Sequence, residues 1–388
     1  MNKNKSISIV LVAITFLIFT GATYLLFSEN PISSNVKVSA PTVGTSGALS
    51  FDNTLPKTEA CPMNGTLYSK QQRAWWEQHR PLGIMIENHQ DARPQSGISS
   101  ADVVYEAVAE GGITRFLTIF YCQSAEEVGP IRSARTYFLD FVSEYGASPL
   151  YAHVGGANTS GPADALSQIE TYGWAGVNDM NQFSIGFPTF WRDSTRQGHP
   201  VATEHTMYST TEKLLQYAAT SRNLKITDAN DIPWTKGFVP YDFKDDVSAS
   251  QRPTKQAIYL EFWEGYSDYF VDWTYDPIAN IYKRNVGGVP HIDRNTNKQL
   301  TAKNIVVLTM IESHANDGYT DNEHLLYKTK GTGKANIFMD GKQIIGTWRK
   351  DSRTSRTLLF DSTGAPIKFD RGTIWFEILP TDGILTVK

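Results

Sequence analysis

The hydrophobic positions of the chain change character along its length. Residues 7–27 form an apolar run without a charged side chain, and as a helix this run spans about 31 Å, the thickness of a bilayer's hydrocarbon core. Residues 80–222 alternate short apolar runs with helical spacing, and residues 240–388 hold mostly alternating, aromatic-rich runs. This order predicts an α+β fold: an N-terminal membrane anchor helix, a mixed α/β domain, and a mostly β C-terminal domain.

Short runs rich in β-branched and aromatic residues mark the expected strands. They cover 82–86, 103–105, 116–121, 150–154, 257–262, 269–273, 281–283, 305–308 and 374–376. Helical spacing predicts a helix over 134–145, a second helix from Gly161, and a third after the capping-box sequence Ser209–Glu212. Asp340-Gly341 predicts a tight hairpin turn.

The N-terminal segment predicts a location outside the cytoplasm. Lys3 and Lys5 precede the apolar run and favour a cytoplasmic N-terminus, so we expect a single-pass protein of the cell membrane whose ectodomain faces outside. The alternative is a cleaved signal peptide, but its only candidate site, Val38-Ser39-Ala40, lies far downstream. The predicted parts are a cytoplasmic tail (1–6), the transmembrane anchor (7–27), a flexible linker (28–58), the α/β domain (59–232) and the mostly β domain (233–388).

Composition narrows the classes of function. The 388 residues carry 36 Lys and Arg against 40 Asp and Glu, so bulk positive charge is absent and no nucleic-acid partner is expected. The 2 cysteines exclude a four-cysteine zinc site, and outside the cytoplasm Cys61 and Cys122 either form one disulfide or remain two thiols. The sequence has no nucleophile elbow, P-loop or His-Glu-x-x-His spacing, so neither a metal nor a cofactor is expected.

Arginine dominates the polar positions of the α/β domain. The candidate anion-binding residues are Arg115, Arg132, Arg135, His153, Arg192 and Arg196. Arginine presents a fixed fork of donors to phosphate or carboxylate, and Arg132 and Arg135 stand where the helix over 134–145 is expected to begin, which also favours an anion. The alternative interpretation is that these arginines form structural ion pairs with nearby acids, namely Glu87, Glu106, Glu110 and Asp193.

Three histidines offer proton chemistry. His153 ends an expected strand and is followed by Gly155-Gly156, where a histidine either exchanges protons in a cleft or serves as a structural residue. His89 and His205 leave the same two interpretations open. If all three converged with the arginines, they would form a cleft for a charged substrate.

Longer strings resemble a known family. The strings over Arg80–His89, Ala92–Gly97, Ala101–Ala107, Glu110–Phe116 and Gly129–Arg135 closely resemble the YerB-like family of lipoproteins, and Gly333–Trp348 looks like that family's second domain. The resemblance implies a membrane-attached, extracytoplasmic bacterial protein of two domains with unassigned function. This sequence departs from the family pattern because no lipidation cysteine follows its apolar run.

These observations predict a membrane-anchored cell-envelope protein that binds an anionic ligand through its arginines. The expected ligand is an anionic wall polymer, a lipid-linked precursor, or a protein partner in wall synthesis. One alternative is an envelope enzyme that acts on a pyrophosphate-linked or anionic wall precursor, with arginines stabilising charge and His153 or a carboxylate moving protons. The other alternative is a non-catalytic structural scaffold in which every arginine is paired.

Overall fold

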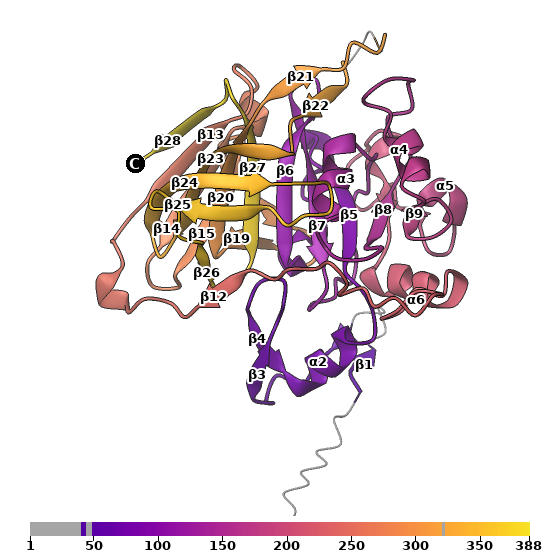
Figure 1. Cartoon of the computed structure of the whole chain (residues 1–388), viewed down its shortest axis with the longest axis horizontal. Helices are drawn as coiled ribbons and strands as arrows, with labels where there is room; N and C mark the ends of the chain where they lie inside the picture. The colour runs from indigo at the N-terminus through magenta and orange to yellow at the C-terminus, as the bar shows by residue number, and fades with distance from the viewer. Residues whose placement is uncertain (1–39, 44–48, 320–322) are drawn as a thin grey trace, which may run out of the picture. The chain divides into compact units, whose positions relative to one another are not determined.

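A ten-stranded sheet runs through both halves of the chain (Figure 1). The protein is described here from a computed structural model, which covers residues 40–43, 49–319 and 323–388. In spatial order the strands of this central sheet are β25 (Leu358–Asp361), β24 (Lys342–Lys350), β23 (Gly331–Met339), β20 (Asn304–Met310), β27 (Ile374–Pro380), β6 (Val103–Glu110), β7 (Ile113–Phe120), β5 (Leu82–Glu87), β8 (Leu150–His153) and β9 (Asp179–Asn181). Strands β25 to β27 in this order come from the second half of the chain, and β6 to β9 come from the first.

The predicted anchor lies outside the described residues. The same holds for the predicted tail and for residues 28–39 and 44–48 of the predicted linker. Within the described ranges, no helix is long and apolar enough to cross a bilayer. The described end of the linker contains a short antiparallel pair, β1 (Thr42–Val43) with β2 (Leu49–Ser50).

The two halves of the central sheet meet at the parallel pair of β6 and β27. Val104 lies opposite Trp375, and Tyr105 lies opposite Phe376. All four side chains are buried, and the rings of Tyr105 and Phe376 stack with their centroids 4.7 Å apart. The sheet therefore continues without a break across the joint, and Ala40–Lys388 forms one compact unit.

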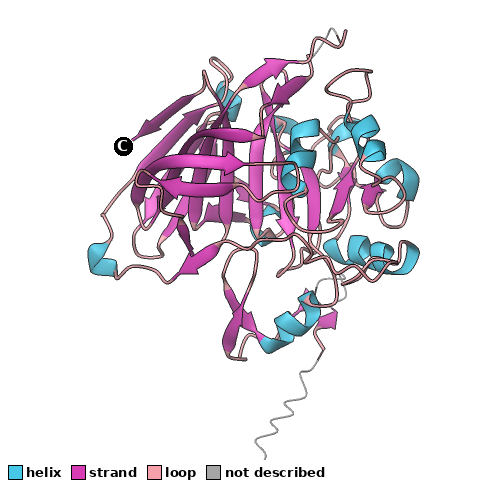
Figure 2. Cartoon of the chain, viewed as in Figure 1, coloured by secondary structure: helices cyan, strands magenta, loops and turns pink. Residues whose placement is uncertain are grey.

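Helices gather around the first half of the chain (Figure 2). They are α2 (Lys70–Trp76), α3 (Thr136–Val142), α4 (Ala165–Thr171), α5 (Gln182–Ile185) and α6 (Thr211–Ser221), together with the short 3-10 turns η1 (Gln90–Ala92), η2 (Ile98–Ser100) and η3 (Thr203–His205) and the short strands β3 (Lys57–Ala60), β4 (Leu67–Ser69), β10 (Trp191–Arg192) and β11 (Met207–Tyr208). Helix α3 is shorter than predicted because Arg135 is still extended and forms its N-cap.

The second half adds a smaller sheet that packs on the central one. Its strands are β16 (Val289–Pro290), β15 (Ile281–Val286), β14 (Val271–Asp276), β13 (Ala257–Glu261) and β28 (Ile384–Val387), with β19 (Thr301–Ala302) also paired to β15. Trp273 of β14 packs edge-on against Trp375 of the central sheet, with ring centroids 5.2 Å apart. The prediction of a mostly β second half is confirmed.

Three short strand pairs and two 3-10 turns complete the second half. They are β12 (Asp242–Lys244) with β26 (Lys368–Asp370), β17 (Ile292–Asp293) with β18 (Lys298–Gln299), β21 (Glu312–His314) with β22 (Leu325–Tyr327), and the turns η4 (Ala249–Gln251) and η5 (Ser267–Tyr269).

The predicted hairpin turn is confirmed between β23 and β24. Asp340 and Gly341 connect the two strands, and both have positive φ, 54° and 69°. A two-residue hairpin turn of this kind requires positive φ at both positions, which Asp tolerates and Gly adopts freely. Local sequence is therefore sufficient to define this turn.

The predicted cap of the third helix is wrong by one residue. Thr210 caps α6 and accepts a hydrogen bond from the backbone N–H of Lys213 at 3.0 Å. Ser209 is unavailable because its hydroxyl donates to the Thr189 carbonyl at 2.7 Å and its backbone pairs with Val128. The backbone pairing of Ser209 with Val128 therefore moves the helix cap from Ser209, which the capping-box sequence predicts, to Thr210.

Arg284 on β15 joins the smaller sheet to the central one. Its side chain is fully buried and pairs with the fully buried carboxylate of Glu106 on β6. Its guanidinium carbon lies 5.7, 5.5 and 5.0 Å from the ring centroids of Phe116, Trp273 and Trp375. A buried charge is stable only with such partners, so this pair fixes the register of the two sheets.

Glu377 on β27 lies beside this pair. It is fully buried and accepts a hydrogen bond from the Trp273 indole N–H at 2.8 Å. Burial, together with the nearby Glu106 carboxylate, raises the pKa of Glu377 well above its ordinary value. This shift favours the neutral form of Glu377 beside the ion pair of Arg284 and Glu106.

Removing the cation of this cluster should destabilise the protein strongly. We expect Arg284→Met to lower the free energy of unfolding by about 3–5 kcal/mol, because Glu106 is left as a buried, unpaired charge. Urea denaturation measures the effect. The matched control is Arg349→Met, which breaks an exposed pair with Asp351 and should cost less than about 1 kcal/mol. Equal losses in the two variants would contradict this role of Arg284.

A disulfide between Cys61 and Cys122 ties the segment after β3 to the segment that follows β7. Asp102 lies beside it and is fully buried. One carboxylate oxygen of Asp102 accepts the backbone N–H groups of Tyr121 and Cys122 at 2.8 Å, and the other accepts from Asn64 at 3.0 Å. Burial outweighs these hydrogen bonds and raises the pKa of Asp102 to about 7.

The raised pKa of Asp102 predicts a pH-dependent stability. The folded protein retains a proton that the unfolded chain releases near pH 4, so this contribution to stability is complete below about pH 4 and is lost as pH rises to about 7. Relative to Asp102→Asn, the wild type should lose up to ~4 kcal/mol between pH 4 and pH 8. Thermal or urea unfolding of both proteins across this range measures the difference, and parallel curves would contradict the prediction.

Candidate functional site

Arg132 and Arg192 line one cavity of about 560 Å³ in the first half of the chain. We call it the Arg132 cavity. Its lining residues are Ile131, Arg132, Ser133, Val154, Gly155, Gly156, Asn158, Leu166, Phe183, Arg192, Thr203, Glu204 and Met207. Two of the six candidate residues therefore share a cavity, and their neighbours offer hydroxyl and amide groups.

Backbone pairing places the cavity at the carboxyl ends of parallel strands. β5 and β8 are parallel, and so are β8 and β9. The backbone N–H of Arg132 donates to the Met85 carbonyl at 2.9 Å, and the carbonyl of Arg132 accepts from Val154 at 3.0 Å. Gly155 adopts a φ of 56° just beyond β8, which turns the chain around the cavity. Ligands of α/β folds commonly bind at this edge of a sheet.

The Arg132 side chain forms an ion pair with one acid, and among the described residues its Nε–H has no hydrogen-bond partner. Its Nε lies 3.0 Å from an Oε2 atom of Glu87, a carboxylate that is 3% exposed. Among the described residues, the two terminal nitrogens of Arg132 have no hydrogen-bond partner. Glu87 is also paired with Nδ1 of His205 at 2.9 Å. Burial opposes its charge, but His205 and Arg132 together lower the pKa of Glu87.

Arg192 on β10 brings a second guanidinium to the cavity. One of its terminal nitrogens donates to the Thr203 carbonyl and, at 3.2 Å, to the Thr206 hydroxyl. Arg192 is exposed, and in the described part of the chain no acidic side chain pairs with it. Its charge therefore faces solvent at the cavity.

Arg115 and Arg135 share one acid instead. Both guanidinium groups pair with the carboxylate of Glu110, at 3.0 Å for Arg115 and in a shorter contact for Arg135. Both side chains are buried, and burial lowers their pKa values. The structure therefore gives these two arginines an internal partner, as the ion-pair interpretation expects.

Arg196 is also satisfied within the protein. It lies 2.7 Å from the Glu127 carboxylate and donates to the Ser96 hydroxyl and to the Asn295 side chain. It links the first half of the chain to the segment around β17 and β18. Arg196 does not line the Arg132 cavity.

His153 uses both ring nitrogens. It is fully buried, with Nε2 2.6 Å from Asp179 and Nδ1 2.6 Å from the Gly155 carbonyl. The side chain thus braces the glycine turn beside the cavity. It has no nitrogen left to exchange a proton with a ligand.

Two cavity residues could not be selected from the sequence. Phe183 is 75% exposed on the short helix α5, and Asn158 lies in the loop after the glycine turn. Neither belongs to a motif, and only the tertiary fold brings them to Arg132. Exposure of a large aromatic ring is the signal that distinguishes Phe183, and it requires coordinates.

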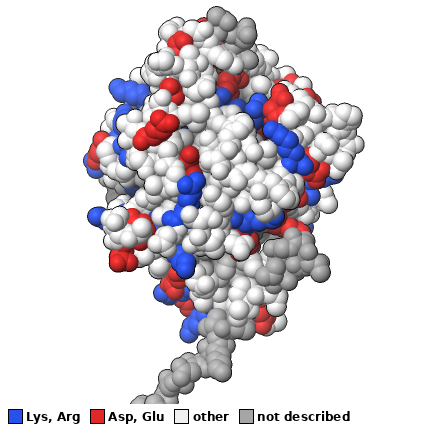
Figure 3. All heavy atoms as spheres, turned by 90° about the vertical axis from the view of Figure 1, so that its right-hand side faces the viewer, with Lys and Arg blue, Asp and Glu red and all other residues white. Residues whose placement is uncertain are grey.

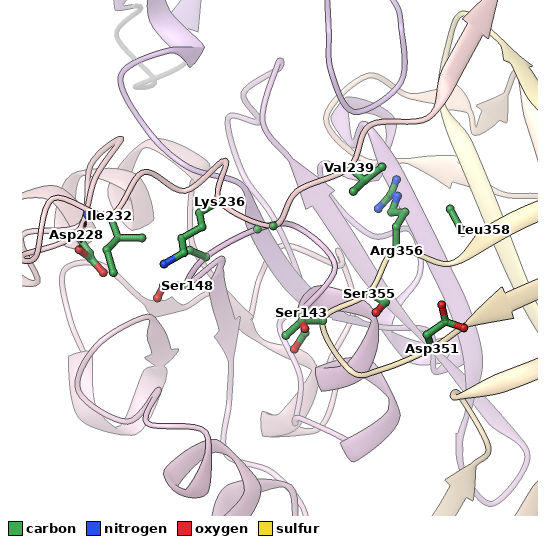
Figure 4. A pocket seen from close by; sticks show the side chains of 14 residues that line it. Ser143, Ser148, Asp228, Ile232, Lys236, Val239, Asp351, Ser355, Arg356 and Leu358 are labelled. Atoms are coloured by element: carbon green, nitrogen blue, oxygen red, sulfur yellow. Dashed lines mark hydrogen bonds between the residues drawn. The ribbon is translucent and has the colours of Figure 1, made fainter.

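A second cavity, of about 700 Å³, lies between loops of both halves (Figure 4). Its charged residues stand apart, with Lys236 and Arg356 on different segments. Arg356 is already occupied, because its guanidinium lies 4.0 Å from the Tyr241 ring centroid and pairs with the buried Glu144. This cavity lacks the convergence of free donors found at Arg132.

Surface charge does not favour one sign near these helices. On the face that carries α4, α5 and α6, basic and acidic side chains are interspersed (Figure 3). Long-range attraction by a single-sign patch is therefore not a feature of this face.

Comparisons with known proteins agree with the sequence resemblance. The family domain described as "Protein of unknown function (DUF3048) N-terminal domain" matches residues 67–225, and the corresponding C-terminal domain matches residues 258–376. The Bacillus subtilis (strain 168) protein named "Putative lipoprotein YerB" is 29% identical over 309 residues, which cover 78% of this chain and 82% of that protein.

A crystal structure of YerB from Bacillus subtilis has a similar fold. It superposes with a TM-score of 0.67 at 26% identity, over 85% of this chain and 100% of that chain. The central sheet, the paired family domains and the sequence strings thus agree. The chain belongs to the YerB-like family, whose two domains carry the DUF3048 description.

Proposed function

We propose that this protein is a membrane-anchored, extracytoplasmic cell-envelope protein whose Arg132 cavity binds an anionic ligand. The observation that carries the proposal is the state of Arg132: its Nε lies 3.0 Å from the Glu87 carboxylate, while both terminal nitrogens lack a partner among the described residues and the residue lines a cavity. A guanidinium beside a single buried carboxylate keeps its two terminal nitrogens available as a fork of donors for an anion.

The surroundings of Arg132 suit an anion with additional polar groups. Arg192 adds a second charge, and Ser133, Asn158 and Thr203 line the same cavity. Hydroxyl and amide groups supply hydrogen bonds that complement the two guanidinium groups. A phosphate or carboxylate within a larger polar molecule therefore fits this set of donors better than an apolar ligand does.

The proposed location rests on the N-terminal apolar run and on the relative's name. Residues 7–27 have the length of a membrane-spanning helix, and we propose that they anchor the chain in a single pass with the compact unit outside. The name of the Bacillus subtilis relative, a lipoprotein, supports attachment to the membrane. An anionic wall polymer or a lipid-linked precursor is a ligand available at that location, and so is a protein partner in wall synthesis.

Binding has more support than catalysis. A proton-transfer role for His153 lacks support because both of its nitrogens have internal partners. The scaffold alternative is supported for Arg115, Arg135 and Arg196, which all have acidic partners. It does not account for Arg132 and Arg192.

The proposal is tested by measuring how tightly variants that lack one arginine charge bind anionic ligands. Each lost charge-assisted hydrogen bond is worth roughly 1.5–3 kcal/mol, so Arg132→Gln and Arg192→Gln should each weaken binding about 10- to 100-fold. We would measure the shift in melting temperature and the affinity of the full-length protein in detergent, with inorganic pyrophosphate, glucuronic acid and a glycerol phosphate polymer as probes.

The controls separate a lost site from a lost fold. Arg349→Gln, an exposed arginine outside the cavity, should bind like the wild type. Arg115→Gln should instead lower the melting temperature without ligand, because it disturbs the buried Glu110 cluster. Unchanged affinity in both Arg132→Gln and Arg192→Gln, with the fold intact, would refute the proposed site.

A further inference from the structure

Phe183 brings an aromatic ring to the Arg132 cavity from the short helix α5. The residue is 75% exposed, so the rest of the protein covers only a small part of the ring. Small-molecule sites are lined mainly by apolar and aromatic side chains, with a few polar groups that set specificity. The uncovered ring of Phe183 is therefore available as a contact surface for whatever the cavity binds.

The backbone of Phe183 is tied to the glycine turn of the cavity. The side-chain oxygen of Asn181 accepts the backbone N–H of Gly155 and the backbone N–H of Phe183, each at 3.2 Å. A Cβ atom added to Gly155 would lie only 3.0 Å from a ring carbon of Phe183, so the ring lies directly against this turn. Through Asn181, the cavity wall positions the aromatic residue.

Polar groups without partners line the same cavity. Arg132 and Arg192 supply the two guanidinium groups described above. Among the described residues, the side chains of Ser133, Asn158 and Thr203 also have no hydrogen-bond partner, and all three line the cavity. A ligand that carries hydroxyl groups as well as an anionic group can use all of these side chains, whereas a small inorganic anion cannot.

Glu204 adds an exposed carboxylate to the cavity. A carboxylate accepts hydrogen bonds from hydroxyl groups, but it repels an anion that has no donor to offer. Its presence in the same cavity as two arginines favours an anionic ligand that also donates hydrogen bonds. A sugar that carries a phosphate has this property, and a phosphate on an alkyl chain does not.

We propose that the Arg132 cavity binds a sugar phosphate whose pyranose ring stacks on Phe183. This inference rests on the proposed anion site and names the chemical class of its ligand. The C–H groups on one face of a pyranose pack against the negative face of an aromatic ring, while the phosphate meets the guanidinium groups. The cavity volume of about 560 Å³ lies within the range of ~300–1,000 Å³ found for small-molecule sites.

Calorimetric titration of the full-length protein in detergent tests the proposal. The probes are glucosyl phosphate, inorganic phosphate and butyl phosphate, at about pH 8, where all three are mainly dianions. Glucosyl phosphate should bind at least about tenfold more tightly than either of the others, because it alone combines the ring with hydroxyl groups. A decyl ester of glucosyl phosphate and an oligomer of sugar phosphates, titrated alongside, distinguish a lipid-linked source from a polymeric one.

Variants of Phe183 test the stacking itself. Phe183→Ala should weaken the binding of glucosyl phosphate about 3- to 10-fold and leave the binding of inorganic phosphate unchanged. Phe183→Tyr keeps an aromatic face and should bind like the wild type, whereas Phe183→Leu should resemble Phe183→Ala. The matched control is Phe187→Ala, because Phe187 is 83% exposed in the same segment and does not line the cavity. This control should bind like the wild type.

The outcomes separate this inference from the proposed anion site. Arg132→Gln should weaken the binding of inorganic phosphate and of glucosyl phosphate alike, and unchanged binding of both would count against the anion site itself. If Arg132→Gln weakens both but Phe183→Ala binds as Phe187→Ala does, the anion site stands and the sugar stacking is overturned. Equal affinity of the wild type for glucosyl phosphate and butyl phosphate would also overturn it.

Discussion

The joining of the two halves depends on the buried pair of Arg284 and Glu106. Each charge alone would be costly in an interior closed to water, and together they are tolerated because the pair is complete and aromatic rings surround the cation. The pair connects β15 of the smaller sheet to β6 of the central sheet. Any other register would separate the charges, so the pair selects one arrangement among many that would bury similar apolar area.

The same physical rule explains most of the arginines in the first half. A buried or half-buried guanidinium needs hydrogen-bond acceptors, and Arg115, Arg135 and Arg196 each have an acid among theirs. Arginine density in this sequence therefore reflects the fold more than a ligand. Arg132 and Arg192 differ because they line a cavity and, within the described part of the chain, keep donors without a partner. The candidate site is therefore smaller than the set of six residues that the sequence suggests.

The sequence was sufficient where local rules decide. Most strand positions and the Asp340-Gly341 turn followed from patterning along the chain. The pairing of Arg115 with Glu110, 5 residues away, was one of two interpretations that the sequence left open. The sequence was insufficient where contacts between segments far apart in the chain determine the structure. Nothing in the strings around Glu106 and Arg284 indicates that they meet, and Ser209 lost its role as a cap to pairing with Val128. The cavity itself requires the return of the chain after β8 and β9, which no local pattern encodes.

The parallel pairing of β6 with β27 also constrains the order of folding. β6 lies early in the sequence, but β27, its parallel neighbour in the central sheet, consists of residues 374–380. If the N-terminal half is made first, the edge of β6 that β27 later covers has no partner strand until residues 374–380 follow. An unpaired strand edge of this kind is prone to pair with other chains. A protein that crosses a membrane from its N-terminal side would have to keep that edge protected for most of its passage, which places a demand on the export process rather than on the finished fold.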